Sequence, residues 1–329
     1  MVLDLEKSHG RRLYDSRSGR EVLDLFSFFA TLPIGFNHPG MKDPDFLARL
    51  MRAALVNPTN SDIYTTEFAE FIEVFGRVAM RPWLDHSFFI AGGAVAVENA
   101  VKAAMDWKVR QNMRKGLSGE KGTQILHFRE AFHGRTGYTV SMTNTADPRK
   151  YQYFARFDWP RVSNPYLRFP VTPAELERVQ AAEAASIAEI RRAFADRPNE
   201  IAAILVEPIQ GEGGDHHFRP EFLAALKVVA HEHEALLIFD EVQTGVGLTG
   251  TFWAHESLGT QPDIVSFGKK MQVCGILGGG KLMDEPDNVF KVSSRINSTW
   301  GGNLVDMVRC QRYLEIIEEE KLVQNAADV

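Results

Sequence analysis

Short apolar runs alternate with longer segments of helical periodicity through the middle of the chain. Each run is typical of a strand buried on both faces, and two of the runs end in an acidic residue. The predicted strands span His86–Ala91, Gln124–Phe128, Ile201–Glu207, Ala235–Asp240 and Asp263–Phe267. The predicted helices span Ala94–Arg114, Thr172–Ala195, Pro220–Glu234 and Leu304–Glu319. This alternation predicts an α/β fold in which helices flank a mostly parallel sheet.

Local signals support two of these helices. Thr172-Pro173-Ala174-Glu175 is a capping box with proline at the first helical position. In the helix that begins at Pro220, apolar residues recur at helical spacing and line one face: Phe222, Leu223, Leu226, Val229 and Ala230. The portion before about Leu84 instead looks irregular and rich in aromatic residues.

Composition and charge exclude several classes of protein. The 329 residues are 44% hydrophobic and carry a net charge of −6 without a long basic run, so nucleic acid and anionic membranes are poor partners. No stretch of 18 apolar residues and no secretory signal peptide is visible. Two cysteines give neither a disulfide framework nor a metal-binding spacing, and His231 and His233 point to different sides of a helix. We therefore expect a cytoplasmic protein without a metal site.

Two of the predicted strands deliver polar groups at their C-terminal ends. Asp240 ends an apolar run, and Lys269 follows the run that starts at Asp263. In open α/β sheets, ligands bind at this edge of the sheet. A carboxylate beside an amine is the pair that pyridoxal phosphate requires, because the acid keeps the ring nitrogen protonated and the amine holds the aldehyde. Gly92-Gly93-Ala94, where a strand turns into a helix, would offer backbone N–H groups to the phosphate.

Four stretches in this order resemble the fold-type I, class III (omega) aminotransferases, and most closely the lysine 6-aminotransferases. They are Glu207–Asp215, Ile238–Gly245, Phe267–Gly275 and Asn297–Asn303. The resemblance covers nearly the whole chain. It implies a pyridoxal-phosphate enzyme that moves the terminal amino group of L-lysine to 2-oxoglutarate, as a homodimer with a shared active site.

The resemblance also implies roles for the residues that hold the cofactor. Asp240 would pair with the pyridinium nitrogen. Lys269 would form the Schiff base, with Lys270 as the alternative if the register slips by one residue. Phe132 would stack on the ring, and Thr299 would reach the phosphate in the neighbouring subunit.

Three further residues would act on the substrates. Arg135 would hold a substrate carboxylate, because a planar guanidinium suits that bidentate contact. Gln243 would bond the phenolic oxygen of the cofactor and lie beside the substrate. Glu212, in a glycine-rich stretch, would help one pocket accept both lysine and a dicarboxylic keto acid by pairing with an arginine or swinging away.

The ends of the chain leave two other interpretations open. Relatives begin earlier and continue through a C-terminal domain, so we expect residues 1–84 to be part of a small domain with a linker, 85–303 the cofactor-binding large domain, and 304–329 the start of a helix leading to a missing domain. The chain could then be a truncated, non-catalytic protein that binds the cofactor. It could also be another omega-aminotransferase, which acts on ornithine, 4-aminobutyrate or a diamine.

Overall fold

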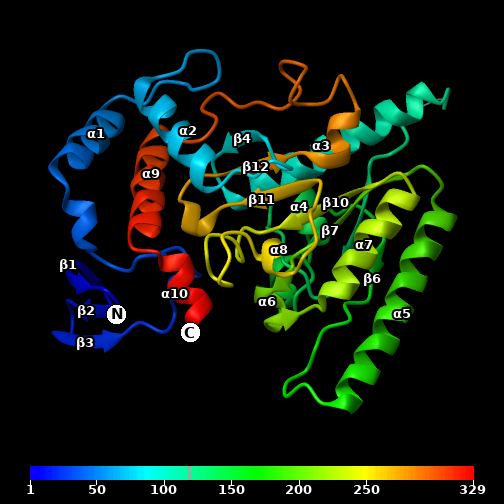
Figure 1. Cartoon of the computed structure of the whole chain (residues 1–329), viewed down its shortest axis with the longest axis horizontal. Coiled ribbons are helices and arrows are strands. Elements are labelled where there is room, and N and C mark those ends of the chain that lie inside the picture. The colour runs from blue at the N-terminus through cyan, green and yellow to red at the C-terminus, as the bar shows by residue number, and fades with distance from the viewer. Residues whose placement is uncertain (118–119) are drawn as a thin grey trace.

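A seven-stranded sheet forms the centre of the computed structural model, which describes residues 1–117 and 120–329 (Figure 1). The strand order is β4-β12-β11-β10-β7-β5-β6. The strands are β4 (His86–Ile90), β5 (Gln124–Phe128), β6 (Arg161–Val162), β7 (Ile201–Val206), β10 (Leu236–Asp240), β11 (Ile264–Phe267) and β12 (Cys274–Gly278). Only β12 runs antiparallel to its neighbours, so the expected mostly parallel sheet is confirmed. The sequence patterns did not predict β12 or β6.

One face of the sheet is covered by the long helix α3 (Gly93–Arg114), which contacts β7, β10, β11 and β12. Its buried face consists largely of small residues, including Ala100, Ala103 and Ala104, so the helix lies close to the strands. Leu236 and Ile238 of β10 belong to the same apolar cluster. Side chains at alternate positions of a strand point to the same face, and these two therefore mark the α3 side.

The opposite face is covered by α5 (Pro173–Asp196) and α7 (Pro220–Glu232), which stand together at one side of the molecule (Figure 1). Leu237 and Phe239, which alternate with the α3-facing residues of β10, join the apolar cluster on this side. Both faces of β10 are thus buried, as its continuous apolar run predicts. Half of the capping box predicted at the start of α5 forms: Thr172 accepts a hydrogen bond from the Glu175 N–H, whereas the Glu175 carboxylate accepts one from the Arg168 N–H.

The N-terminal portion is more regular than its sequence suggests. It forms a three-stranded antiparallel sheet, β1 (Leu3–His9), β2 (Arg12–Asp15) and β3 (Arg20–Leu23), followed by α1 (Pro44–Leu55) and α2 (Thr66–Val78). Both helices pack on α9 (Leu304–Glu319), which leads into α10 (Leu322–Asp328). The aromatic residues of α2 are core residues of this contact, because Phe71 and Phe75 are fully buried.

The remaining short elements lie around the C-terminal edge of the parallel strands. They are α4 (Gly137–Met142), β8 (Ile209–Gln210), α6 (Gly211–Gly214), β9 (His216–His217) and α8 (Ala254–Ser257). Among the described residues, no helix combines the length and apolar character needed to cross a lipid bilayer.

Asp263 anchors the opposite, N-terminal edge of the strands. Its buried carboxylate accepts hydrogen bonds from the Lys227 ammonium (2.6 Å), the Leu237 N–H (2.8 Å) and the Lys281 N–H (3.1 Å), and it lies 3.0 Å from the His231 ring. Burial opposes ionisation, but the hydrogen bonds to His231 and Lys227 prevail and hold the pKa of Asp263 below its usual value. One side chain thus ties α7, β10 and the segment after β12 together.

We predict that Asp263→Ala lowers the free energy of unfolding by about 3 kcal/mol, because it leaves a half-buried ammonium, one buried N–H group and one half-buried N–H group without their acceptor. Urea denaturation of the cofactor-loaded protein measures this change. The matched control is Asp284→Ala, which removes an exposed carboxylate nearby and should alter stability by about 0.5 kcal/mol or less. Equal effects of the two substitutions would contradict the anchoring role.

Candidate active site

A cavity of about 320 Å³ lies where β10 and β11 end and α3 begins. This volume is within the usual range for a site that binds a small molecule or cofactor. Eight residues predicted from the sequence line it: Gly93, Ala94, Phe132, Arg135, Glu212, Asp240, Gln243 and Lys269. Four further residues complete the lining: His133, Gly134, Glu207 and Val242.

The pairing of β10 with β11 brings the candidate acid and amine together. The strands are parallel, and Asp240 lies opposite Ser266. Lys269 follows three residues later, at the start of a 3-10 turn, with a φ of 46° that few non-glycine residues adopt. A side chain at Gly268 would come within 2.9 Å of the Cys274 sulfur, so only glycine allows the turn to pack so closely on β12.

The Asp240 carboxylate is buried and firmly held. One oxygen accepts hydrogen bonds from the Ser266 hydroxyl and the Val242 N–H, each at 3.1 Å. The other oxygen lies 2.8 Å from Nδ1 of His133. Nε2 of His133 is buried and has no partner among the described residues. Sequence reasoning did not assign this histidine a role, although it stands between Phe132 and Arg135 in a segment that had been singled out.

The two adjacent lysines occupy different environments. The Lys269 amine enters the cavity and donates a hydrogen bond to the side-chain oxygen of Gln243. Burial lowers its pKa, against the opposing effects of Asp240, Glu207 and Glu212. The Lys270 amine instead bonds the main-chain oxygen of Gln243, and Lys270 does not line the cavity. Burial, followed by the charge of Lys269, lowers the pKa of Lys270 to about 8. The geometry therefore favours Lys269 as the reactive amine.

The first turn of α3 forms another wall of the cavity. Gly92 precedes the helix and has no side chain with which to cap it, so the first N–H groups remain available to an anion. The segment that follows Phe132 packs tightly against this turn. Gly134 has a φ of 128°, and a side chain there would come within 2.5 Å of Cβ of Ala94. This close contact places Phe132 and Arg135 beside the start of α3.

Glu207 was an uncertain pocket residue by sequence, and it lines the cavity from the end of β7. One of its oxygens accepts a hydrogen bond from the Phe132 N–H at 2.8 Å, which fixes the loop that carries the aromatic ring. Burial raises the pKa of Glu207 to about 7, with a lowering effect from His133 and a raising effect from Asp240. The cavity thus holds one carboxyl group that titrates near neutral pH beside another that is bonded to His133.

Glu212 has a partner that the sequence did not reveal. Its carboxylate forms an ion pair with Lys150, whose ammonium also lies 5.8 Å from the centroid of the Phe132 ring. The Thr145 hydroxyl holds the same ammonium at 3.3 Å. Arg135 lines the cavity and forms no ion pair with any other described residue, so its guanidinium is available to a substrate carboxylate.

Thr299 lies outside this cavity. It belongs to the loop before α9, where its carbonyl oxygen accepts a hydrogen bond from the Thr59 hydroxyl. A role for Thr299 in the cavity of a neighbouring subunit therefore remains a prediction.

The family model for class-III aminotransferases matches residues 1–329. The chain belongs to this family. As a member it is a pyridoxal-phosphate-dependent enzyme with the fold of these aminotransferases, as its sequence predicts.

Individual relatives agree with the family match. The chain is 54% identical over 328 residues to the L-lysine-epsilon aminotransferase of Mycobacterium tuberculosis, which covers 99% of this chain and 72% of the relative. It is 50% identical over 324 residues to the L-lysine-epsilon aminotransferase of Streptomyces clavuligerus, covering 98% of this chain and 70% of that protein. A solved structure of a lysine aminotransferase from M. tuberculosis in the internal aldimine form superimposes with a TM-score of 0.95 at 53% identity, covering 98% of this chain and 74% of that one.

The residues of the cavity fit pyridoxal phosphate. An uncapped helix start suits its phosphate, the Phe132 ring offers an aromatic face, and the Lys269 amine can bind its aldehyde. The buried carboxylate of Asp240, bonded to His133, can stabilise a protonated ring nitrogen. When bound, the cofactor supplies an electron sink for the electrons released at the substrate carbon.

We predict that Lys269→Ala abolishes the visible absorbance of the cofactor-loaded protein, because it removes the amine that enters the cavity. Lys270→Ala is the matched control, since its amine bonds a main-chain oxygen, and we expect it to retain the absorbance band. Absorbance spectra of both purified variants after loading with cofactor measure the difference. The reverse pattern would show that the reactive position is Lys270.

We predict that Lys150→Met raises the KM for a dicarboxylic keto acid by about tenfold, because it leaves the Glu212 carboxylate unpaired and removes a cation from the edge of the cavity. We expect kcat to change less, since Lys150 contacts no group that carries the reaction. Steady-state kinetics measure both values. Lys150→Arg keeps the charge and serves as the control. An unchanged KM in Lys150→Met would exclude this role.

Proposed function

We propose that the chain is an L-lysine 6-aminotransferase, which transfers the terminal amino group of L-lysine to 2-oxoglutarate and yields 2-aminoadipate 6-semialdehyde and glutamate. The observation that carries this proposal is the 54% identity to an L-lysine-epsilon aminotransferase over 99% of the chain. The cavity supports it independently, because one small space presents an amine, a buried carboxylate, an aromatic ring and a free guanidinium.

In this reaction, Lys269 would move the proton. Its buried amine has a lowered pKa, which raises the fraction of the neutral form that can accept a proton from the terminal carbon of the substrate and return it later. Asp240 would hold the positive charge of the ring nitrogen, with His133 and Ser266 keeping its carboxylate in place. Gln243 would orient the Lys269 amine through the hydrogen bond between their side chains.

Different charged groups at the edge of the cavity would act on the two substrates. Arg135 would bind the α-carboxylate of lysine, which leaves the terminal amine directed toward Lys269. The ion pair of Glu212 with Lys150 would limit how strongly that acid repels an incoming keto acid. One cavity could then accept a cationic side chain in one half-reaction and an anionic one in the other.

The assembly and location of the enzyme also remain proposals. We propose a homodimer in which Thr299 of one subunit contacts the cofactor phosphate of its partner, since Thr299 lies outside the cavity of its own chain. Cys274 and Cys310 are free and buried, which suits a cytoplasmic enzyme in a reducing compartment. We also propose that residues 1–84 are part of a small domain with a linker, that residues 85–303 form the cofactor-binding large domain, and that residues 304–329 begin a helix leading to a further domain.

We predict that kcat/KM with 2-oxoglutarate is about 10- to 200-fold higher for L-lysine than for L-ornithine, because ornithine lacks one methylene and cannot span from Arg135 to the reactive amine as well. Coupled glutamate formation, measured with lysine, ornithine and 4-aminobutyrate as donors, tests this. Arg135→Gln should reduce the preference, because the α-carboxylate loses its partner.

Two outcomes would contradict the proposal in different ways. Equal or higher kcat/KM with ornithine or 4-aminobutyrate would assign the chain to another omega-aminotransferase. Reductive trapping of the cofactor on Lys269 without turnover of any amine donor would instead identify a chain that binds the cofactor but does not catalyse the reaction.

A further inference from the structure

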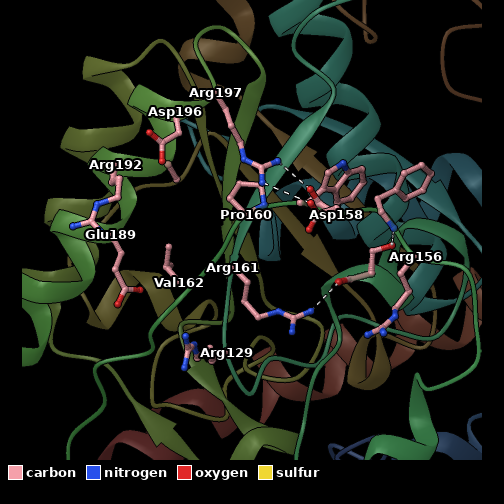
Figure 2. Close-up of a pocket in the computed structure, with 14 residues that line it drawn as sticks. Arg129, Arg156, Asp158, Pro160, Arg161, Val162, Glu189, Arg192, Asp196 and Arg197 are labelled. Atoms are coloured by element: carbon pink, nitrogen blue, oxygen red, sulfur yellow. Dashed lines mark hydrogen bonds and ion pairs between the residues drawn. The ribbon is translucent and has the colours of Figure 1, made fainter.

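A second and larger cavity, of about 770 Å³, lies away from the catalytic cavity and shares no lining residue with it. It lies between the edge strand β6 and the C-terminal half of α5 (Figure 2). Five arginines line it: Arg129, Arg156, Arg161, Arg192 and Arg197. We call this cavity the arginine basin. Three carboxylates also line it, so it is cationic in a chain whose net charge is −6.

Three of these arginines come from separate segments and face the same space. Arg129 follows β5, Arg161 opens β6, and Arg156 lies in the loop before it. In Figure 2 their side chains lie across the lower part of the view, with Arg161 between Arg129 and Arg156. None of the three forms an ion pair with any residue in 1–117 or 120–329. The carboxylates of the basin therefore leave these three charges uncompensated.

A buried histidine fixes the position of Arg161, which lies between the other two arginines. Nε of Arg161 donates a hydrogen bond to Nε2 of His127 at 3.2 Å. Burial, and then the charge of Arg161, lowers the pKa of His127 to about 3, so this ring stays neutral and accepts the bond. Burial lowers the pKa of Arg161, and the charges of Arg156 and Arg129 add to this effect. A buried histidine thus fixes a guanidinium among others that repel it.

Three of the other charged groups of the basin, Arg197, Asp158 and Glu189, have partners of their own. Arg197 bonds the Gln124 side chain at 2.8 Å and lies 3.9 Å from the Asp158 carboxylate. Glu189 accepts the Ser163 N–H at 2.8 Å. In Figure 2, Arg192 and Asp196 of α5 lie away from Arg129, Arg156 and Arg161, whereas Glu189 lies nearer to Arg129. The anion-binding part of the basin is therefore the group Arg129, Arg156 and Arg161.

We propose that the arginine basin is a second binding site, which takes an oligophosphate anion through Arg129, Arg156 and Arg161. Guanidinium groups match phosphate oxygens with paired hydrogen bonds, and several linked phosphates can satisfy three of them at once. A short dicarboxylate has four carboxylate oxygens, so it can form paired hydrogen bonds with only two of the three guanidinium groups, and it would leave much of the 770 Å³ unfilled. This site is independent of the proposed transamination and of the catalytic cavity.

Two aromatic residues at the rim of the basin offer a contact that a nucleotide base can make and an inorganic oligophosphate cannot. Phe157 and Trp159 stack at 5.0 Å with an angle of 11°, and Phe157 remains 52% exposed. A purine could extend this stack while its phosphates reach the arginines. Adenosine triphosphate and inorganic tripolyphosphate both carry three linked phosphates, but only the nucleotide has a base that can stack on Phe157.

The test is calorimetric titration of tripolyphosphate into the cofactor-loaded enzyme, so that the phosphate subsite of the cofactor is already filled. Arg129→Gln combined with Arg156→Gln should weaken binding about 100-fold, at about tenfold for each lost charge-assisted contact. Neither side chain makes a hydrogen bond or ion pair within the described chain, so folding should be preserved. Arg161 is left intact because it bonds His127.

The matched control is Arg149→Gln combined with Arg168→Gln, which removes the same charge from surface arginines outside the basin. We expect this variant to bind tripolyphosphate as the unmodified enzyme does. If adenosine triphosphate binds more tightly than tripolyphosphate and Phe157→Ala removes the difference, the ligand of the basin is a nucleotide. If the two bind with equal affinity, the site recognises the phosphate chain alone. Absence of saturable binding at about 0.1 M ionic strength, or equal weakening in both double variants, would overturn the proposal.

Discussion

The parallel pairing of β10 with β11 is the constraint on which the catalytic cavity depends. Because Asp240 lies opposite Ser266, the two strands end together, and the turn that follows β11 returns Lys269 toward the acid. Gly268 and the left-handed backbone of Lys269 make this turn as tight as the neighbouring Cys274 allows. A shift of one residue in this register would turn the carboxylate out of the cavity, since alternate side chains of a strand point to opposite faces.

The titratable groups that line the cavity lie close enough to shift one another's pKa values. Asp240 lies 2.8 Å from the His133 ring, burial raises the pKa of Glu207 to about 7, and burial lowers the pKa of Lys269. Titratable groups with displaced pKa values gather where an enzyme must move protons near neutral pH. Burial, followed by the charge of Lys269, also lowers the pKa of Lys270, but the Lys270 amine bonds the main-chain oxygen of Gln243 and does not line the cavity. A lowered pKa therefore does not distinguish the two lysines, whereas the position of the amine does, because only the Lys269 amine enters the cavity.

The sequence predicted those parts of the fold and site that depend on local pattern. Apolar runs identified the parallel strands except the two-residue β6. The end of one run located Asp240, and Lys269 follows shortly after another. β12 was not predicted because two of the five residues of Cys274–Gly278 are glycines, and one of its two sheet neighbours is the distant β4. Lys150 and His133 were missed for a similar reason. Their partners Glu212 and Asp240 lie far along the chain, so only the folded structure joins them.

The single antiparallel strand has a consequence for how the protein is made. Among the described residues of the central sheet, β4, which ends at Ile90, pairs only with β12, which begins at Cys274. During synthesis, the early strand therefore leaves the ribosome long before its hydrogen-bonding neighbour exists, and its backbone N–H and C=O groups stay open meanwhile. Closure of this side of the sheet must wait until nearly the whole chain has emerged, which makes it a late and slow event in folding.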